Sequence, residues 1–445
     1  MLVAALALGW VWGGGCGIPQ HDALDLPGAA RPELEGGERL SLAAKASYFE
    51  RVLEARFIAP EGWVTYRQPA TATAHTYRST ADCTIWTGCL LGAEAFRWAV
   101  TRQPRARERA LLHLEGLHAL GQVSGERGVW ARAMWPAGLP HIRRLPEHRP
   151  GQGRYAGYEY RGDVSKDQIS GVVFGLACAW KLLAAEEPRA RALVREDATA
   201  LAAHLLEHGL VLHWEGRPTT HGKLKGRIYG APIGLHALIV LAAFKLAALS
   251  SGEERFRLAY RELLEQGYPE LTYWTKFQLL GLTNHNNDNM QMLAAAALLL
   301  LEEDERVRAP VRAGLERTWR YVRREGNSWF TYVCQAAARE RDAWALEQAR
   351  RSLERFPLEL RNLPFDLRED PRLAAVPRRG WPLHHGVPTV WWALPVSYRQ
   401  PTSFIWRSCP YELVAGGDGS VVNAPVDYVL AYWAGRYWGL LPAEP

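Results

Sequence analysis

The chain has 445 residues, of which 48% are hydrophobic and 22% are charged, and this composition is typical of a globular protein with a large core. Its formal net charge is +6, and no run of like charges concentrates that excess. The pattern excludes a basic nucleic-acid-binding arm, so we expect no nucleic-acid partner, and it slightly favours an acidic ligand such as a uronate or a sulfated sugar.

The N-terminus opens with an apolar run over residues 2–12, followed by three glycines and Cys16. The run is too short to span a bilayer as a helix and lies where the apolar region of a secretion signal lies. The small residues before Cys16 resemble a bacterial lipobox, which implies that a lipid is attached to Cys16. We therefore expect a signal peptide over 1–15, a tether over 16–40, and a lipoprotein anchored through Cys16 to a membrane of the bacterial cell envelope. Secretion without an anchor, or a periplasmic location, is the alternative.

Helical segments of two kinds alternate along the rest of the chain. Segments with a charged face are predicted over 41–58, 103–120, 188–210, 252–266, 304–324 and 340–356. Segments that are apolar on all sides are predicted over 81–100, 163–180, 229–248 and 284–301, and from 327 and 427 onward. A helix that is apolar all round has to be buried, whereas an amphipathic helix belongs at the surface.

Six pairs of one outer and one inner helix predict an all-α fold in which hairpins bury their inner helices by closing a ring. We therefore predict an (α/α)6 toroid that forms a single domain over 41–445, with a loop-rich stretch at 357–426. An open α-solenoid is the alternative.

The stretch from Asp163 to Gly171 is the most informative of the inner-helix starts, because five of its first six residues are polar and a long apolar run follows. Ser165 and Gln168 have the spacing of a capping box. Glycines at 171 and 175 allow a neighbouring helix to pack closely. Helix capping with a salt bridge is the structural alternative to a ligand-binding role for this cluster.

Because the inner helices of a toroid run parallel, the polar residues at their N-termini should gather at one end of the barrel, which we call the mouth. Long loops at 59–81, 121–162, 212–228 and 357–426 precede inner-helix starts and should line the same end. The residues predicted to lie there are Asp82, Trp86, Glu159, Asp163, Lys166, Asp167, Gln168, Tyr229, Asn284, His285, Asn287, Asp288, Asn327 and Asp427.

Cleavage of a glycosidic bond usually needs two carboxyl groups, one that donates a proton and one that is ionised. Asp163 or Asp167 is predicted to supply one of them, and Asp82 or Asp288 the other. His285 is a candidate general base for a lyase or an epimerase that removes a proton next to a carboxylate.

The cysteine and histidine patterns of the sequence give little support to a metal or cofactor site. The cysteines after Cys16 are odd in number and contain no C-x-x-C pair, which disfavours zinc and iron–sulfur sites. The segment from His204 to His208 matches the H-x-x-E-H pattern of some zinc proteases, but it lies on an outer-type helix without an evident third ligand. We expect no metal and no cofactor.

The alternating helices, the aromatic loops and the Asp-led inner starts resemble the six-hairpin glycosidase-like superfamily. That superfamily includes unsaturated glucuronyl hydrolases, other glycosidases, polysaccharide lyases and sugar epimerases, and the resemblance covers most of 41–440. In unsaturated glucuronyl hydrolases the two important acidic residues lie at early inner-helix starts, and the resemblance implies Asp82 and Asp163 as the comparable positions.

Together these features predict an exported carbohydrate-active enzyme, a glycoside hydrolase whose paired Asp carboxylates lie at inner-helix N-termini. A lyase or an epimerase on the same scaffold is one alternative. The other is a non-catalytic envelope lipoprotein that binds a glycan or a protein partner. The residues predicted to bind substrate are Trp86, Glu159, Lys166, Gln168, Tyr229, Asn284 and Asn287.

Overall fold

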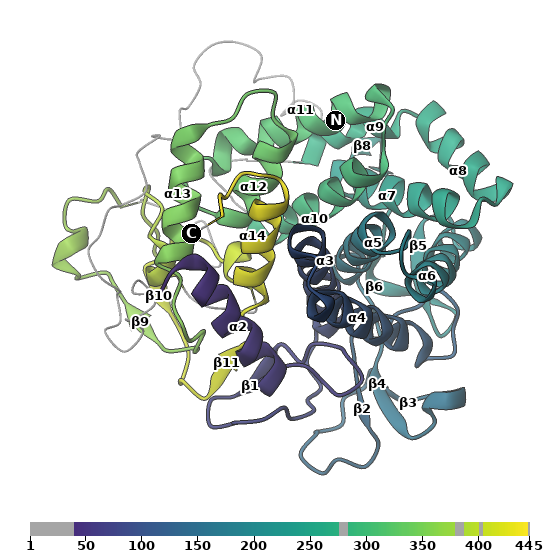
Figure 1. The fold of residues 1–445 in the computed structure, drawn as a ribbon, viewed down its shortest axis with the longest axis horizontal. Helices are drawn as coiled ribbons and strands as arrows, with labels where there is room; N and C mark the ends of the chain where they lie inside the picture. The colour runs from purple at the N-terminus through teal and green to yellow at the C-terminus, as the bar shows by residue number, and fades with distance from the viewer. Residues whose placement is uncertain (1–39, 276–283, 379–386, 400–403, 444–445) are drawn as a thin grey trace.

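The computed structural model describes residues 40–275, 284–378, 387–399 and 404–443, and twelve of its longer helices form six consecutive hairpins (Figure 1). The outer helices are α2 (Leu42–Arg56), α4 (Pro104–Gln122), α6 (Pro188–Glu207), α8 (Glu254–Glu265), α11 (Glu305–Val322) and α13 (Ala343–Glu354). The inner helices are α3 (Cys83–Thr101), α5 (Lys166–Leu182), α7 (Gly234–Ser251), α10 (His285–Leu301), α12 (Ser328–Ala337) and α14 (Val426–Tyr437).

The six inner helices form a closed ring. Each contacts the next in chain order, and the last, α14, packs against the first, α3. Helices α5 and α10 also touch across the ring, so side chains fill its centre. The predicted (α/α)6 toroid is therefore confirmed, and the closing contact between α14 and α3 excludes an open solenoid.

The inner helices are buried because their sequences have no charged face. Helix α7 has a mean hydropathy of 1.7 over its 18 residues, and 78% of that window is buried. By length and composition this helix could cross a membrane, but here it is an inner helix of the barrel, in contact with α5, α6, α8 and α10.

Glycines allow α3 and α5 to approach each other closely. A Cβ atom on Gly88 would lie 2.1 Å from the carbonyl oxygen of Gly171, and one on Gly175 would lie 2.7 Å from the carbonyl oxygen of Gly88. Real Cβ contacts are not that short, so the absence of side chains at these positions sets the distance between the two helices.

The outer ring is closed by a buried lysine. Lys45 on α2 is fully buried, and its Nζ donates hydrogen bonds to the carbonyl oxygens of Leu353 at 3.0 Å and Phe356 at 3.2 Å, and also to that of Glu354. These carbonyls lie at and just beyond the C-terminus of α13, where the backbone has unpaired acceptors and the helix dipole favours a cation. The bond to Leu353 spans 308 residues of sequence.

The loops carry short antiparallel strands. These are β1 (Arg67–Pro69) with β11 (Val421–Asn423), β2 (Ala133–Pro136) and β3 (His148–Pro150) on either side of β4 (Tyr158–Arg161), β5 (Val211–Trp214) with β6 (Arg217–Lys223), β7 (Arg227–Ile228) with β8 (Ala231–Pro232), and β9 (Phe365–Asp366) with β10 (Val414–Ala415). The inner helix predicted from 229 begins instead at Gly234, because residues 227–232 form the β7–β8 hairpin, with Tyr229 and Gly230 at positive φ in its turn.

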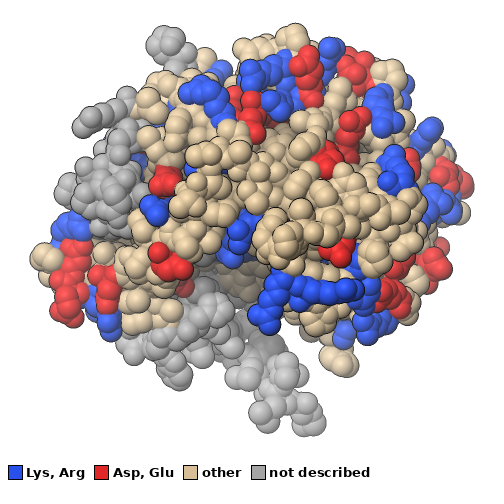
Figure 2. Space-filling model, turned by 90° about the horizontal axis from the view of Figure 1, so that it is seen from below, with Lys and Arg blue, Asp and Glu red and all other residues tan. Residues whose placement is uncertain are grey.

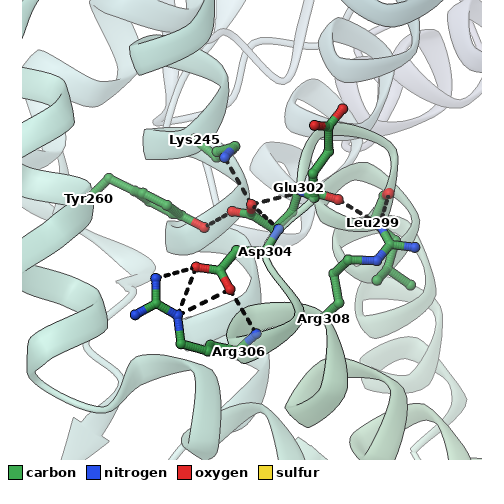
Figure 3. A network of polar contacts seen from close by, with 8 residues as sticks. Lys245, Tyr260, Leu299, Glu302, Asp304, Arg306 and Arg308 are labelled. Carbon is green, nitrogen blue, oxygen red and sulfur yellow. Dashed lines mark hydrogen bonds and ion pairs between the residues drawn. The ribbon is translucent and has the colours of Figure 1, made fainter.

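At the end opposite the inner-helix N-termini, Glu302 joins three helices (Figure 3). This residue follows the C-terminus of α10 and accepts hydrogen bonds from Lys245 of α7 at 3.0 Å and from the Tyr260 hydroxyl of α8. Burial alone would raise the pKa of Glu302, but the hydrogen bonds from Tyr260, the Asp304 amide and Lys245 lower it. The charge network therefore has a structural role.

The outer surface mixes charges of both signs, and Figure 2 shows acidic and basic side chains interspersed over its described part. Many of them pair along one helix, as in the bond from Arg320 to Glu316 at 3.1 Å. Exposed pairs of this kind add little stability.

Candidate active site at the mouth of the barrel

The N-termini of all six inner helices meet at one end of the barrel. Gln168 of α5 donates a hydrogen bond to Asp82 at the start of α3, and Arg407 reaches both Asp82 and Asn286 of α10. Burial lowers the pKa of His236 in the first turn of α7, and the charge of Lys166, the first residue of α5, lowers it further. The starts of α12 and α14 are joined through the segment described next, so the predicted mouth exists.

Residues 404–407, which we call the mouth segment, lie across these helix starts. The Ile405 amide donates a hydrogen bond to Asp427 of α14 at 2.8 Å, and the carbonyl oxygen of Trp406 accepts one from Asn327 Nδ2, just before α12, at 2.7 Å. Phe404 stacks on Trp86 of α3, with ring centroids 4.5 Å apart and planes 14° apart. The mouth segment is thus held by three inner helices.

The contacts of residues 404–406 place Arg407 among the inner-helix starts. Its guanidinium lies 3.7 Å from Asp82 Oδ2, 3.1 Å from the side-chain oxygen of Asn286, and over the Trp86 ring at 5.4 Å from the centroid. One arginine therefore connects the starts of α3 and α10.

Asp82 is a buried carboxylate of the candidate site, with 8% of its surface exposed. Its Oδ1 accepts a hydrogen bond from Gln168 Nε2 at 3.0 Å and lies 3.6 Å from Arg132. Burial raises the pKa of Asp82; Arg407 and Arg132 oppose the rise, whereas the charge of Asp167 adds to it, and the pKa remains above its usual value. Asp82 also precedes α3 without making a side-chain capping bond, so its carboxylate is not used as a cap.

The predicted capping box at α5 is wrong. The side chain of Ser165 makes no capping bond, and Gln168 reaches away from its own helix to α3. Its Oε1 accepts the Ile85 amide at 3.1 Å while its Nε2 donates to Asp82. A fully buried glutamine satisfied in this way orients the carboxylate and keeps α3 and α5 in register.

The other two acidic residues near α5 differ in their surroundings. Asp163 has a positive φ of 56° before the helix, and its Oδ1 accepts a hydrogen bond from the Thr220 amide of β6 at 2.9 Å. Asp167 lies in the first turn of α5, is half-buried, and is near enough to Asp82 for its charge to act on the pKa of that carboxyl. The structure therefore brings Asp167, more than Asp163, together with Asp82.

The predicted residues of α10 are used in several ways. Asn284 caps the helix by accepting a hydrogen bond from the amide of Asn287 at 3.1 Å, and both residues are exposed. His285 is buried, and its Nε2 lies 2.9 Å from Glu325, which also accepts a hydrogen bond from the Tyr411 hydroxyl. Asp288 is buried, and its charge adds to the effect of burial in raising the pKa of Cys334 on α12.

Several buried side chains close to the mouth have polar atoms without hydrogen-bond partners among the described residues. They include Ser165 Oγ before α5 and both amide atoms of Asn289 on α10, as well as Trp86 Nε1 and His285 Nδ1. The two helices are in contact. An unsatisfied buried polar group costs about 1–3 kcal/mol, and such groups usually mark a place for water, an ion or a ligand.

The remaining predicted positions lie farther from Asp82 along the loops. Glu159 on β4 accepts a hydrogen bond from Trp135 Nε1 at 3.1 Å, and Tyr229 is fully exposed in the turn of the β7–β8 hairpin. Cys16 lies outside the described residues. Within the described ranges, no three His, Cys, Asp or Glu side chains gather where they could hold a metal. His204 has a structural role, because its Nε2 accepts the His213 amide at 3.0 Å.

Three arginines around Asp82 were not predicted. Arg67 on β1, Arg132 before β2, and Arg407 all act on the pKa of Asp82 and come from three of the loop regions predicted to line the mouth. The loop lengths therefore indicated where these residues lie, although no motif singled them out.

The fold and the site thus define an (α/α)6 toroid with a carboxylate and arginine cluster at the N-terminal ends of its inner helices. No family model matches the chain, and none of the curated proteins matches its sequence. Among solved structures, a GH76 alpha-mannanase from Bacteroides thetaiotaomicron is similar at 8% identity and a TM-score of 0.43, covering 90% of this chain and 96% of that one. A Bacteroides ovatus GH9 structure is similar at 12% identity and a TM-score of 0.44, covering 90% and 83%. Likeness at this level carries no information about the activity of this chain.

Proposed function

We propose that the protein is a glycoside hydrolase that uses Asp82 as general acid and Asp167 as the second carboxylate, the catalytic base or nucleophile. The observation that carries the proposal is the contrast between the two groups. Asp82 is buried with a raised pKa, whereas Asp167 is half-exposed at the same mouth, and a glycosidase needs two carboxyl groups whose surroundings separate their protonation states.

In this mechanism the proton of Asp82 passes to the glycosidic oxygen as the bond from that oxygen to the anomeric carbon breaks. Asp167 removes a proton from the attacking water or bonds to the anomeric carbon itself. Gln168 and Arg132 hold the Asp82 carboxyl in place, and Arg407 stabilises the carboxylate once the proton has left. Ser165 and Asn289 offer unsatisfied polar groups to the substrate or to ordered water.

We propose an acidic glycan as the substrate, because Arg67, Arg132 and Arg407 surround the site and helix N-termini favour anions. A lyase or epimerase using His285 is less well supported, because that imidazole is buried and its Nε2 is paired with Glu325.

The test is release of reducing ends from neutral and acidic glycans by the wild type, Asp82→Asn and Asp167→Asn, with Asp163→Asn as the matched control. We expect the first two variants to lose activity by a factor of about 10²–10⁴ while remaining folded. The control should stay active, because an Asn oxygen at 163 still accepts the Thr220 amide. Full activity in Asp82→Asn would refute the assignment. A folded wild type that hydrolyses no glycan, but is stabilised by one, would favour the non-catalytic binding protein.

We also propose that the chain is exported and anchored to the cell envelope through a lipid on Cys16, because residues 2–16 have the pattern of a lipoprotein signal. Labelled palmitate should enter the wild type but not Cys16→Ser, and the variant should leave the membrane fraction. Equal labelling of the two proteins would exclude the anchor at this position.

A further inference from the structure

Exposed aromatic side chains are few among the described residues and lie on segments that flank one inner helix. Among the described residues, the exposed aromatic side chains are Tyr229, Tyr273 and Trp274, and the last two are 36% and 40% exposed. All three belong to segments that flank the start of α7: the β7–β8 hairpin before it, and the turn over Thr272–Thr275 (η4) that packs on it. The other described tryptophans are buried or half-buried.

The turn that carries Tyr273 and Trp274 is rigidly mounted. A Cβ on Gly234, the first residue of α7, would lie 2.4 Å from the Leu271 carbonyl oxygen and 2.9 Å from the backbone of Trp274. A Cβ on Gly314 of α11 would lie 2.5 Å from the Thr272 carbonyl oxygen. The turn is therefore held between α7 and α11 at two places where only glycine fits, and it sits at the rim of the mouth, because α7 begins there. In Figure 1 the labels of α9, β8 and α11 mark this edge of the ring.

Arg317 of α11 completes the arrangement. Its guanidinium lies 4.8 Å from the centroid of the Tyr273 ring and 4.8 Å from that of Trp274, and the two rings are perpendicular with centroids 5.3 Å apart. Within the described part of the chain, no carboxylate pairs with Arg317, and the helical positions three and four residues away are Ala313, Gly314, Arg320 and Tyr321. The guanidinium is thus positioned by the rings, and no carboxylate of the described residues neutralises its charge.

The aromatic rings and the arginine together have the chemical properties needed to bind an acidic sugar. Aromatic faces stack on the apolar face of a pyranose ring, and an arginine beside them can pair with a carboxylate or sulfate on the same sugar. A partly exposed pair of large aromatic rings is also unusual here, because the other large aromatic side chains among the described residues, apart from Tyr229, are buried or half-buried. A neutral sugar would use the rings alone, whereas an acidic sugar would use the whole arrangement.

We propose that Tyr273, Trp274 and Arg317 form an accessory subsite that binds an acidic sugar residue of a glycan whose scissile bond lies at the mouth. The proposal rests on the proposed function in taking a glycan as the ligand. It adds a second place of attachment, on the α7 and α11 side of the rim, formed by residues outside the carboxylate and arginine cluster.

The test measures binding without turnover, so that it can fail separately from the proposed chemistry. Oligogalacturonate, oligomannuronate, hyaluronan and chondroitin sulfate hexasaccharides, with cellohexaose as the neutral probe, are titrated into Asp82→Asn and into the same protein carrying Trp274→Ala or Arg317→Ala. We expect at least one acidic probe to bind, and each added substitution to weaken it by about tenfold, since a stacking or cation contact of this kind contributes about 1–2 kcal/mol.

The controls keep the interpretation specific. Arg320→Ala removes an exposed arginine of the same helix that already pairs with Glu316, and it should leave binding unchanged. Trp274→Phe should retain most of the affinity, and binding of cellohexaose should not respond to Arg317→Ala. Tighter binding of chondroitin sulfate than of hyaluronan, which carries a glucuronate carboxylate but no sulfate, would identify a sulfate as the recognised group, and equal or weaker binding would identify the carboxylate. The subsite is refuted if no acidic probe binds, or if binding is the same with and without Trp274→Ala and Arg317→Ala.

Discussion

Replacing Lys45 with methionine tests how the toroid is closed. The ammonium of Lys45 is buried and donates to three carbonyl oxygens, those of Leu353, Glu354 and Phe356, at and beyond the end of α13. Methionine keeps most of the apolar stem, so the change removes the charge and its hydrogen bonds with little change in volume.

The expected loss follows from these contacts. A hydrogen bond to a charged group contributes about 1.5–3 kcal/mol net, and a buried carbonyl left without a donor costs about 1–3 kcal/mol. The sum is reduced because methionine no longer requires a buried ammonium to be desolvated. We therefore expect the free energy of unfolding to fall by about 3–5 kcal/mol, within the range seen when one partner of a buried charge interaction is removed.

Urea unfolding, followed by tryptophan fluorescence and by far-UV circular dichroism, measures the effect. Lys181→Met is the control, because Lys181 is exposed near the end of α5 and its replacement should change stability by no more than about 0.5 kcal/mol. If Lys45→Met and Lys181→Met unfold at the same urea concentration, the interpretation of Lys45 as the closing contact of the outer ring is wrong.

Three further predictions test the core, the site and a buried charge. Gly88→Ala should destabilise the protein by about 3 kcal/mol or more in urea unfolding, because the new Cβ would lie 2.1 Å from the α5 backbone. Gly157→Ala is the control and should be tolerated, because its Cβ would have nothing within 4 Å. Equal stability of the two variants would contradict the close contact between α3 and α5. Arg407→Gln should raise the pKa of Asp82 further, because Arg407 lowers it, so the alkaline limb of the pH–rate profile should move to higher pH; an unchanged limb would exclude Asp82 as the acid. Burial raises the pKa of Glu94 from 4.5 to about 8, so the contribution of this residue to stability is complete below about pH 4.5 and is lost as the pH rises towards 8. The melting temperature of Glu94→Gln should therefore change less with pH over that window than the melting temperature of the wild type. Equal slopes of melting temperature against pH for the two proteins would refute this prediction.

The parts of the fold that depend on local sequence were predictable. Helices such as α7 and α10 are apolar on every side and long, so their burial followed from their residues, and the alternation with charged helices then required a ring. The start of α7 was misplaced because Tyr229 and Gly230 form a hairpin turn at positive φ that apolar periodicity does not register.

The candidate site was predictable only in its position. The Asp-led inner starts indicated which end of the barrel carries polar groups, and Asp82 and Asp167 were among the predicted carboxylates. The predicted capping box was wrong because it rested only on the spacing of Ser165 and Gln168. Gln168 instead bonds to Asp82, before another helix, and the spacing does not reveal such a partner. Arg407 was missed because it meets Asn286 across 121 residues of sequence, and no local pattern encodes such a contact.

The position of the mouth segment also determines when the site can form. Residues 404–407 follow five complete hairpins, yet they supply the ring that stacks on Trp86 and the guanidinium beside Asp82. In a chain that is being synthesised, Trp86 and Asp82 therefore emerge from the ribosome long before their partners Phe404 and Arg407. We infer that the centre is assembled last, together with the sixth hairpin, and that a partly synthesised or truncated toroid has helices but no functional mouth.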